Sequence, residues 1–393
     1  MNILGIIGGL MLAAFYIGTA VYIGHRLHRW LRFIFPKIRV IAFAIVFILL
    51  SILSLKSLVP LAVPLPVIYY LRLAGGYLTG VFMYMLIFFA ITDIAVAIAR
   101  AVMLIPHNLQ RKLGFFAGTT ALALTAIVAG YGIYNATQIR IVVHEIELRR
   151  DIGDEMTIVL ISDLHLGEVQ SENRLAQMVT YVNNLSPDMV AIAGDIFNDD
   201  FYAIRNPQRA AALFREINAP LGIFACLGNH DSGPTIDSML NFLEASGIQL
   251  LAEEHAIIDD RLVVIGRLDT QFPWIDYGFG GMQRGDFSAI MGAVHEDLVS
   301  RSLPPDLPII VIDHNPLNIN EYGEDVDIAL FGHTHGGALF PITMITRAMY
   351  TIDRGHLQRN YNSPHIVVTQ GVHVWSIPLR VGSQNEIVKI IAR

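Results

Sequence analysis

The sequence holds five short clusters of aspartate, asparagine and histidine between residues 163 and 335. Their candidate functional side chains are Asp163, His165, Asp195, Asn229, His230, His314, His333 and His335. Oxygen and nitrogen ligands of these types suit divalent zinc, manganese or iron. Because histidine titrates near neutral pH, one of them can also serve as a general acid. The clusters therefore point to a metal site with proton transfer beside it.

The five clusters differ in how much each one indicates when taken alone. An Asp-x-His pair occurs often by chance, and the residues of Gly228–Asp231 also favour a simple turn. The segment Gly332–Gly337 is more specific, because two histidines in alternation at a strand end have no packing purpose. Chance does not explain all five clusters in order. We interpret the other histidines of this half as surface or structural residues, namely His144, His255, His295, His356, His365 and His373.

Apolar segments precede the clusters and predict the strands that position them. We expect strands at Ile139–Leu148, Met156–Ile161, Met189–Ala193, Gly222–Cys226, Pro308–Ile312 and Ile328–Phe331. We expect helices between them at Ser171–Leu185, Pro207–Ile217 and Thr235–Ala245. Open α/β sheets place their ligand sites at the carboxyl ends of the strands, so the clusters should meet at one edge.

Charge divides the chain into two parts. Residues 1–138 carry ten Lys and Arg and a single acid, Asp93, whereas the remainder carries 17 basic and 33 acidic residues. An enzyme of nucleic acids would be expected to present a basic face, so the acidic second part argues against such a partner. Cys226 is the only cysteine, which excludes an internal disulfide and a cysteine-based metal site.

The first part contains four apolar stretches that approach the length needed to cross a bilayer, about 20 residues in a helix. They lie near Ile3–Ile23, Val40–Val59, Val67–Ala95 and Leu113–Tyr134. The first stretch lacks a positive leading segment and is too long for a cleaved signal peptide. We therefore predict a four-helix transmembrane domain over residues 1–138 and a second domain over residues 139–393.

The basic residues of the short connections predict the orientation in the membrane. The loop His25–Arg39 is basic, and the third connection holds Arg100, Arg111 and Lys112. Basic loops stay in the cytoplasm, so four spans would leave both termini outside. We expect a multi-pass protein of the inner or plasma membrane with a periplasmic or extracellular second domain. Asp93 is interpreted as a helix-end residue beside Arg100, with an intramembrane polar site as the alternative.

The clusters resemble the calcineurin-like metallophosphoesterases from about Ile139 to the C-terminus. The signature reads Asp163-Leu164-His165, Gly194-Asp195-Ile196-Phe197-Asn198, Gly228-Asn229-His230-Asp231, His314 and Gly332-His333-Thr334-His335. The helical anchor looks like that of the bacterial membrane-bound branch, whose lipid-directed relatives include the UDP-diacylglucosamine pyrophosphatases. The resemblance implies an α/β fold, a four-layer αββα sandwich with two divalent metal ions (Mn, Zn or Fe).

The resemblance also implies a role for each matching residue. One metal would be bound by Asp163, His165 and His335. The other would be bound by Asn229, His314 and His333, with Asp195 bridging the two. His230 would protonate the leaving group, and Asp231 would orient its imidazole.

The expected function is hydrolysis of a phosphoester or pyrophosphate bond at the membrane. A lipid or envelope precursor is the first candidate for the phosphorylated substrate, because a bilayer-bound enzyme has easy access to lipids. Soluble nucleotides or sugar phosphates are one alternative, and a metal-binding signalling or transport module without activity is another. The aromatic segment Gln271–Arg284 is either a loop with a small core or a lip that holds a lipid tail. The oligomeric state and the metals are left open.

Overall fold

The computed structural model describes residues 3–55, 65–102, 110–167, 172–269 and 279–393. The chain forms two compact units. The helical unit comprises Met1–Tyr134 and the short segment Ser376–Leu379, and the second unit comprises Asn135–Trp375 and Arg380–Arg393.

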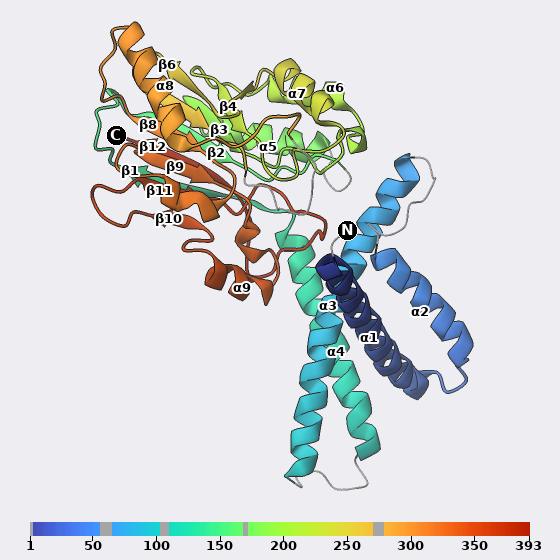
Figure 1. Cartoon of the computed structure of the whole chain (residues 1–393). Coiled ribbons are helices and arrows are strands. Elements are labelled where there is room, and N and C mark those ends of the chain that lie inside the picture. The colour runs from blue at the N-terminus through green and yellow to red at the C-terminus, as the bar shows by residue number, and fades with distance from the viewer. Residues whose placement is uncertain (1–2, 56–64, 103–109, 168–171, 270–278) are drawn as a thin grey trace. The chain divides into compact units, whose positions relative to one another are not determined.

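The helical unit contains α1 (Ile3–Ile34), α2 (Val40–Ser54), α3 (Leu65–Ala101) and α4 (Gln110–Asn135) (Figure 1). Within the described residues, α1, α3 and α4 are long and apolar enough to cross a membrane. The helix α2 has 15 residues, which at the α-helical rise cover about 22 Å, less than a bilayer core of about 30 Å. The second of the four expected spans is therefore a short helix, and residues 56–64 lie outside the described part.

Basic residues that were expected in a loop belong to α1 itself. The helix continues through His25, Arg26, Arg29 and Arg32 and ends at Ile34. Positive side chains are favourable in the last turns of a helix because they face the negative end of its dipole. Asp93 and Arg100 line the same cavity, and the carboxylate of Asp93 pairs with Arg26 at 2.7 Å.

The second unit is built from two six-stranded sheets. The first sheet has the order β1-β12-β2-β3-β4-β5 and the second the order β10-β11-β9-β8-β7-β6. The first consists of β1 (Ile139–Ile146), β12 (Asn385–Ala392), β2 (Met156–Ile161), β3 (Met189–Ala193), β4 (Ile223–Cys226) and β5 (Gln249–Leu250). The second consists of β10 (Gly355–Leu357), β11 (His365–Val368), β9 (Ile328–Phe331), β8 (Ile309–Ile312), β7 (Leu262–Gly266) and β6 (Glu254–Ile258).

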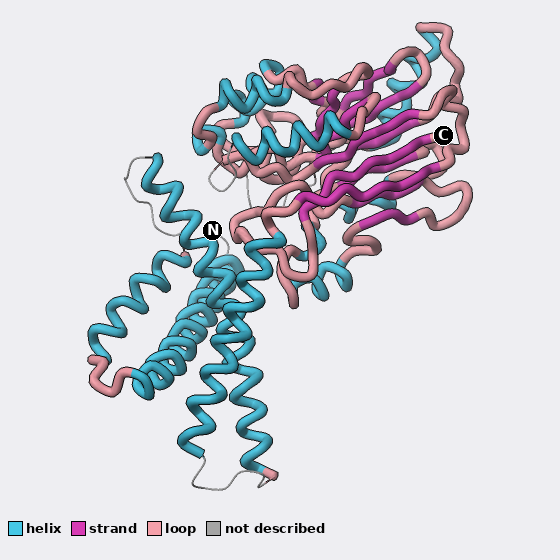
Figure 2. Tube along the Cα trace, turned by 180° about the vertical axis from the view of Figure 1, so that it is seen from behind, coloured by secondary structure: helices cyan, strands magenta, loops and turns pink. Residues whose placement is uncertain are grey.

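Alternation along the strands creates four layers, because successive side chains point to opposite faces of a sheet. Ile158 and Leu160 of β2 pack between the two sheets, whereas Val159 and Ile161 face the helices. The helices α5 (Glu172–Asn184), α6 (Pro207–Phe214) and α7 (Ile236–Ala245) cover the first sheet. The helix α8 (Phe287–Ser300) covers the second sheet (Figure 1). Figure 2 shows the strands of this unit side by side. The expected αββα sandwich is confirmed.

The parallel strands bring their carboxyl ends to one side of the unit. In the first sheet β2, β3 and β4 are parallel, with Ile161 opposite Ile192 and Ala193 opposite Cys226. In the second sheet β7, β8, β9 and β11 are parallel. The last helix, α9 (Ile342–Met349), follows β9 after a short turn at His335–Gly337. The residues that follow β2, β3, β4, β8 and β9 can therefore meet in one site.

Candidate metal centre

The candidate side chains lie in the loops directly after these strands. Five of their residues have positive φ, a region that non-glycine residues rarely adopt. The φ values are 53° for Asp163, 46° for His165, 51° for Asp195, 71° for His333 and 50° for His335. Such conformations cluster at functional sites, where the surrounding structure holds them against their cost. The fold thus turns these loops sharply so that the side chains converge.

A first group of ligands consists of Asp163, His165 and His335. The Nε2 atoms of His165 and His335 lie 3.2 Å apart. Oδ1 of Asp163 lies 3.9 Å from the first of these atoms and 3.4 Å from the second. This oxygen is buried and has no hydrogen-bond partner among the described residues. An unpartnered carboxylate oxygen that faces two imidazole nitrogens fits a divalent cation.

A second group consists of Asp195, His314 and His333, with Asn229 beside it. Nε2 of His314 lies 3.2 Å from Oδ2 of Asp195 and 3.2 Å from Nδ1 of His333. Oδ1 of Asn229 lies 2.9 Å from the same nitrogen of His333. Nδ1 of His314 donates to the carbonyl of Ala193 at 2.7 Å, which leaves Nε2 free to bind a cation.

Asp195 connects the two groups. Its Oδ2 lies 3.2 Å from His314 and 3.7 Å from Nε2 of His165, so a single carboxylate reaches both. Burial raises the pKa of Asp195, but the positive charges of His314 and His230 outweigh burial and hold the pKa well below its usual value. The carboxylate is therefore ionised, as a bridging ligand must be.

Burial lowers the pKa of His314, but the carboxylate of Asp195 outweighs burial and raises that pKa well above its usual value. Burial gives the other three histidines of the two groups the neutral form that binds metals. It lowers the pKa of His165 and of His333 to about 3, and it holds that of His335 well below its usual value. A neutral imidazole keeps a lone pair available for coordination. Burial also raises the pKa of Asp163 to about 6, an effect that a nearby cation would reverse.

The contact expected between His230 and Asp231 is formed by another residue. Nδ1 of His230 lies 2.6 Å from Oδ1 of Asp199. The fully buried carboxylate of Asp231 instead accepts the backbone N–H groups of Phe197 at 2.7 Å and Gly228 at 2.9 Å. The expectation that Asp231 orients the imidazole is thus wrong for this structure. The reason is that the carboxylate of Asp231 points back beneath its own turn, where its hydrogen bonds to these backbone N–H groups stabilise the loop.

The carboxylates around His230 favour its protonated form. Burial lowers the pKa of His230, but Asp195 and Asp199 outweigh burial and raise it to about 9. The ring of Trp375 lies against that of His230, with centroids 5.3 Å apart, and the Trp375 side chain is half exposed. The polar run Asn198-Asp199-Asp200 after the second cluster was a signal for Asp199, whereas no local signal marked Trp375.

Arg380 supports the first group from behind. It is fully buried and donates to the carbonyl of His335 at 2.6 Å, and its Nη2 lies 3.2 Å from Nδ1 of that histidine. Its Nε donates to Asn385 at 2.8 Å. His373, interpreted as surface or structural, is fully buried, and its carbonyl accepts a hydrogen bond from Arg380. Sequence reasoning did not identify Arg380.

The segment Gln271–Arg284 is described only from Phe279 onward, because residues 270–278 lie outside the described part. Phe279 is buried in the core between the first sheet and its helices. Arg284 pairs with Asp313 at 2.9 Å. The described end of this segment is therefore structural, and both interpretations of its other aromatic residues concern the part outside the described residues.

Comparison with known proteins agrees with this geometry. A family model described as calcineurin-like phosphoesterase matches residues 156–337. A transmembrane protein with metallophosphoesterase domain from Danio rerio is 30% identical over 286 residues, which cover 70% of this chain and 62% of the relative. An uncharacterized metallophosphoesterase from Aquifex aeolicus is 30% identical over 237 residues, which cover 60% of this chain and 84% of the relative.

Among solved structures, the NAD nucleotidase of Haemophilus influenzae aligns with a TM-score of 0.38 and 17% identity, covering 57% of this chain and 46% of that one. This chain spans less than two thirds of the length of the Danio rerio relative. Family model, relatives, fold and ligand geometry lead to one conclusion: the chain belongs to the calcineurin-like metallophosphoesterases.

Proposed function

We propose that the protein is a membrane-anchored phosphohydrolase with two metal ions that cleaves a phosphoester or pyrophosphate bond of a lipid-linked substrate. The observation that carries the proposal is the pair of ligand groups joined by Asp195, with His230 and its partner Asp199 beside them. A module that only bound metal would not need that histidine.

The proposed ligand assignment follows the two groups. Asp163, His165 and His335 would hold one cation. His314, His333 and Asn229 would hold the other, and Asp195 would contact both. When bound, two such cations lower the pKa of water and neutralise phosphoryl oxygens.

His230 is the proposed general acid. Asp199 occupies Nδ1 of the ring, so the proton on Nε2 is the one available to the leaving oxygen. Asp199 fixes the direction in which the ring points. Trp375 covers one side of the ring and reduces its contact with water.

An exposed apolar helix favours a lipid-linked substrate over a soluble one. Met344, Ile345 and Met349 of α9 are 61%, 55% and 62% exposed. This helix packs directly against the turn that contains His335. The backbones are so close there that a Cβ atom added to Gly337 would lie 2.5 Å from Cα of Thr343. An acyl chain could thus be held by α9 while its phosphate lies at the ligand groups.

The membrane attachment and its orientation belong to the same proposal. The helices α1, α3 and α4 are apolar, and relatives are named transmembrane proteins. The basic connections support a hydrolase unit outside the cytoplasm when α2 counts as one of four crossings. A cysteine introduced at exposed Leu317 and treated with an impermeant thiol reagent in intact cells or spheroplasts tests this, and complete protection there would overturn the orientation.

The function is tested by a substrate panel with the full chain in detergent. Lipid phosphates, lipid pyrophosphates, nucleotides, sugar phosphates and an aryl phosphodiester are compared after loading with Mn, Zn or Fe. We expect the highest kcat/KM for a lipid-linked substrate, and loss of turnover and of bound metal in Asp195→Ala. Faster turnover of nucleotides or sugar phosphates would overturn the lipid substrate. No turnover of any compound by metal-loaded protein would overturn the hydrolase.

A further inference from the structure

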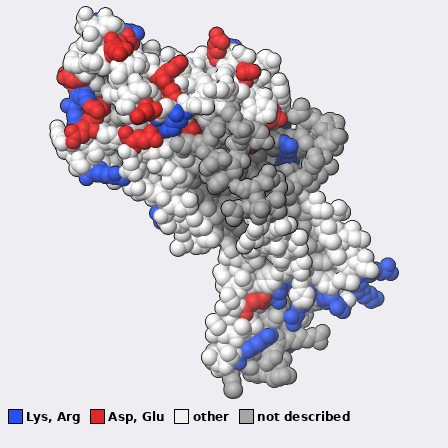
Figure 3. Space-filling view, viewed as in Figure 1, with Lys and Arg blue, Asp and Glu red and all other residues white. Residues whose placement is uncertain are grey.

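The helical unit contains a polar cavity that the proposed hydrolysis does not use. The cavity has a volume of about 340 Å³ and lies between α1, α3 and α4. Its polar lining consists of Tyr22, His25, Arg26, Arg29, Asp93 and Arg100. Figure 3 shows Lys and Arg side chains gathered at one end of this unit beside a single acidic patch.

A fixed network forms one wall of the cavity. Asp93 accepts the hydroxyl hydrogen of Tyr22 at 2.7 Å and pairs with Arg26 at 2.7 Å. The guanidinium of Arg26 also lies over the ring of Phe89, 5.6 Å from its centre. Asp93 is the only acidic residue in the sequence of the helical unit, and its charge is balanced by that of Arg26.

Two arginines of the cavity keep their charges available. Arg29 and Arg100 are exposed, and neither forms an ion pair with any residue that the structure describes. With Arg26 balanced by Asp93, the lining carries a net charge of +2 (three Arg minus one Asp). Ala97, Gly114 and Ala117 are small, which leaves room for a ligand between the arginines. Planar guanidinium groups match the oxygens of a phosphate.

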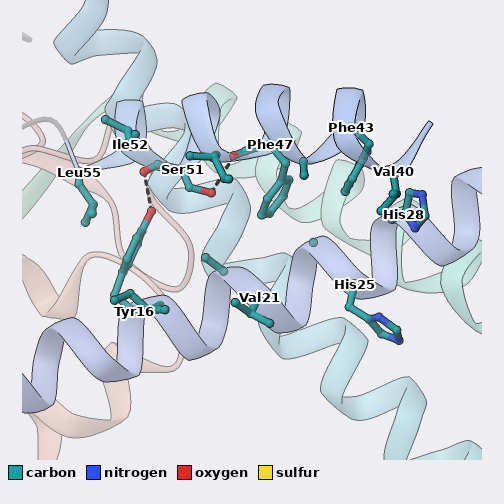
Figure 4. A pocket seen from close by; sticks show the side chains of 15 residues that line it. Tyr16, Val21, His25, His28, Val40, Phe43, Phe47, Ser51, Ile52 and Leu55 are labelled. Carbon is teal, nitrogen blue, oxygen red and sulfur yellow. Dashed lines mark hydrogen bonds between the residues drawn. The ribbon is translucent and has the colours of Figure 1, made fainter. Parts of the chain in front are cut away.

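The apolar side chains around the cavity favour a lipid as the molecule that carries this phosphate. Val21, Ile94 and Ile98 on the same helices are 67%, 60% and 59% exposed, as expected for side chains that face acyl chains. A second cavity, of about 510 Å³ and largely apolar, lies between α1 and α2 and shares His25 with the first. Figure 4 shows Phe43 and Phe47 lining it, with Tyr16 bonded to the carbonyl of Ser51 at 2.6 Å at its other end.

We propose that the cavity between α1, α3 and α4 binds the phosphate group of an anionic phospholipid, one of whose acyl chains lies in the apolar cavity between α1 and α2. Basic pockets between membrane helices are suited to such headgroups because charge attraction is strong where water is scarce. The proposal is independent of the hydrolytic site.

Binding is measured by isothermal titration calorimetry with the full chain in neutral detergent micelles. The probes are short-chain phosphatidylglycerol, short-chain phosphatidylcholine and inorganic phosphate. The test variant is Arg29→Gln with Arg100→Gln. The matched control is Arg32→Gln with Arg39→Gln, which removes the same charge from exposed residues outside the cavity lining.

The test variant is expected to bind phosphatidylglycerol roughly thirtyfold more weakly, from about 1 kcal/mol per arginine. The control should stay within about threefold of the parent, and all variants should hydrolyse a soluble ester equally, which verifies folding. An equal loss of phosphatidylglycerol affinity in the control would show that only the general surface charge attracts the lipid, and this result would overturn the proposed site. Equal binding of phosphatidylcholine would overturn charge recognition. Displacement of the lipid by equimolar inorganic phosphate would overturn the lipid as ligand.

Discussion

Replacing Asp199 with asparagine is expected to shift the alkaline limb of the pH–rate profile to lower pH. His230 must be protonated to act as an acid, so activity is present below its pKa and is lost as pH rises through it. Asp199 helps raise that pKa to about 9. Removing the negative charge therefore lowers the pKa of His230 and moves the limb downward.

The size of the shift follows from the contact and its exposure. Nδ1 and Oδ1 are 2.6 Å apart, but the Asp199 side chain is 67% exposed, so water screens the pair. Unit charges about 4 Å apart in water interact by about 1 kcal/mol, which corresponds to about 0.7 of a pH unit. We expect a shift of that order, together with a severalfold lower kcat because the ring is less well fixed.

The assay is the pH dependence of kcat on an aryl phosphodiester with metal-loaded protein. Asp200→Asn is the matched control, because it removes a neighbouring charge and keeps the oxygen that accepts the N–H of Tyr202. Asp231→Asn should lower stability and move the limb less than Asp199→Asn does, because Asp231 contributes less than Asp199 to raising the pKa of His230. An unmoved limb in Asp199→Asn, or a shift in Asp231→Asn of the size expected for Asp199, would refute this reasoning.

Further substitutions test the acid, the apolar helix and the loop beneath it. His230→Ala should lower kcat by about 10²- to 10⁴-fold while metal content by elemental analysis is unchanged; normal turnover would remove His230 from the mechanism. Met344→Ser should reduce kcat/KM on lipid substrates severalfold and spare the aryl ester, whereas Leu317→Ser, equally exposed, should change neither. Gly337→Ala should lower the free energy of unfolding by about 2 kcal/mol or more, because its φ is +76° and Cα of Thr343 is close. Gly355→Ala, with φ +88° and open space, should cost only about 1 kcal/mol in the same denaturant titration; equal losses would contradict the packing argument.

The strands before the clusters could be predicted because their signal is local. Met156–Ile161, Met189–Ala193 and Ile328–Phe331 have the expected bounds. Each of these segments is apolar and is followed by polar residues, so composition alone marks where it ends. The sequence is less informative for β12, which pairs with β1 at Ile139 opposite Asn385. Such pairing joins residues far apart in the chain and has no local pattern.

The residues of the site also fall into those that a local sequence signal predicts and those that it does not. The side chains of the five clusters converge as expected, because parallel strands place their carboxyl ends together. The choice between Asp199 and Asp231 as partner of His230 depended on the direction of two turns, which residue types do not specify. Arg380 and Trp375 come from a segment without a motif, and only the folded chain brings them to His335 and His230.

The left-handed backbone at five site residues has a consequence for the evolution of the sequence. If each conformation costs about 1 kcal/mol, the five together cost about 5 kcal/mol, a sum as large as the lower end of the stability of an ordinary domain, about 5–15 kcal/mol. A descendant freed from selection for activity should gain stability by exchanging these residues for glycine or asparagine. Retention of Asp163, His165, Asp195, His333 and His335 in a lineage would therefore record continued use of the site, since thermodynamic advantage alone would erase them.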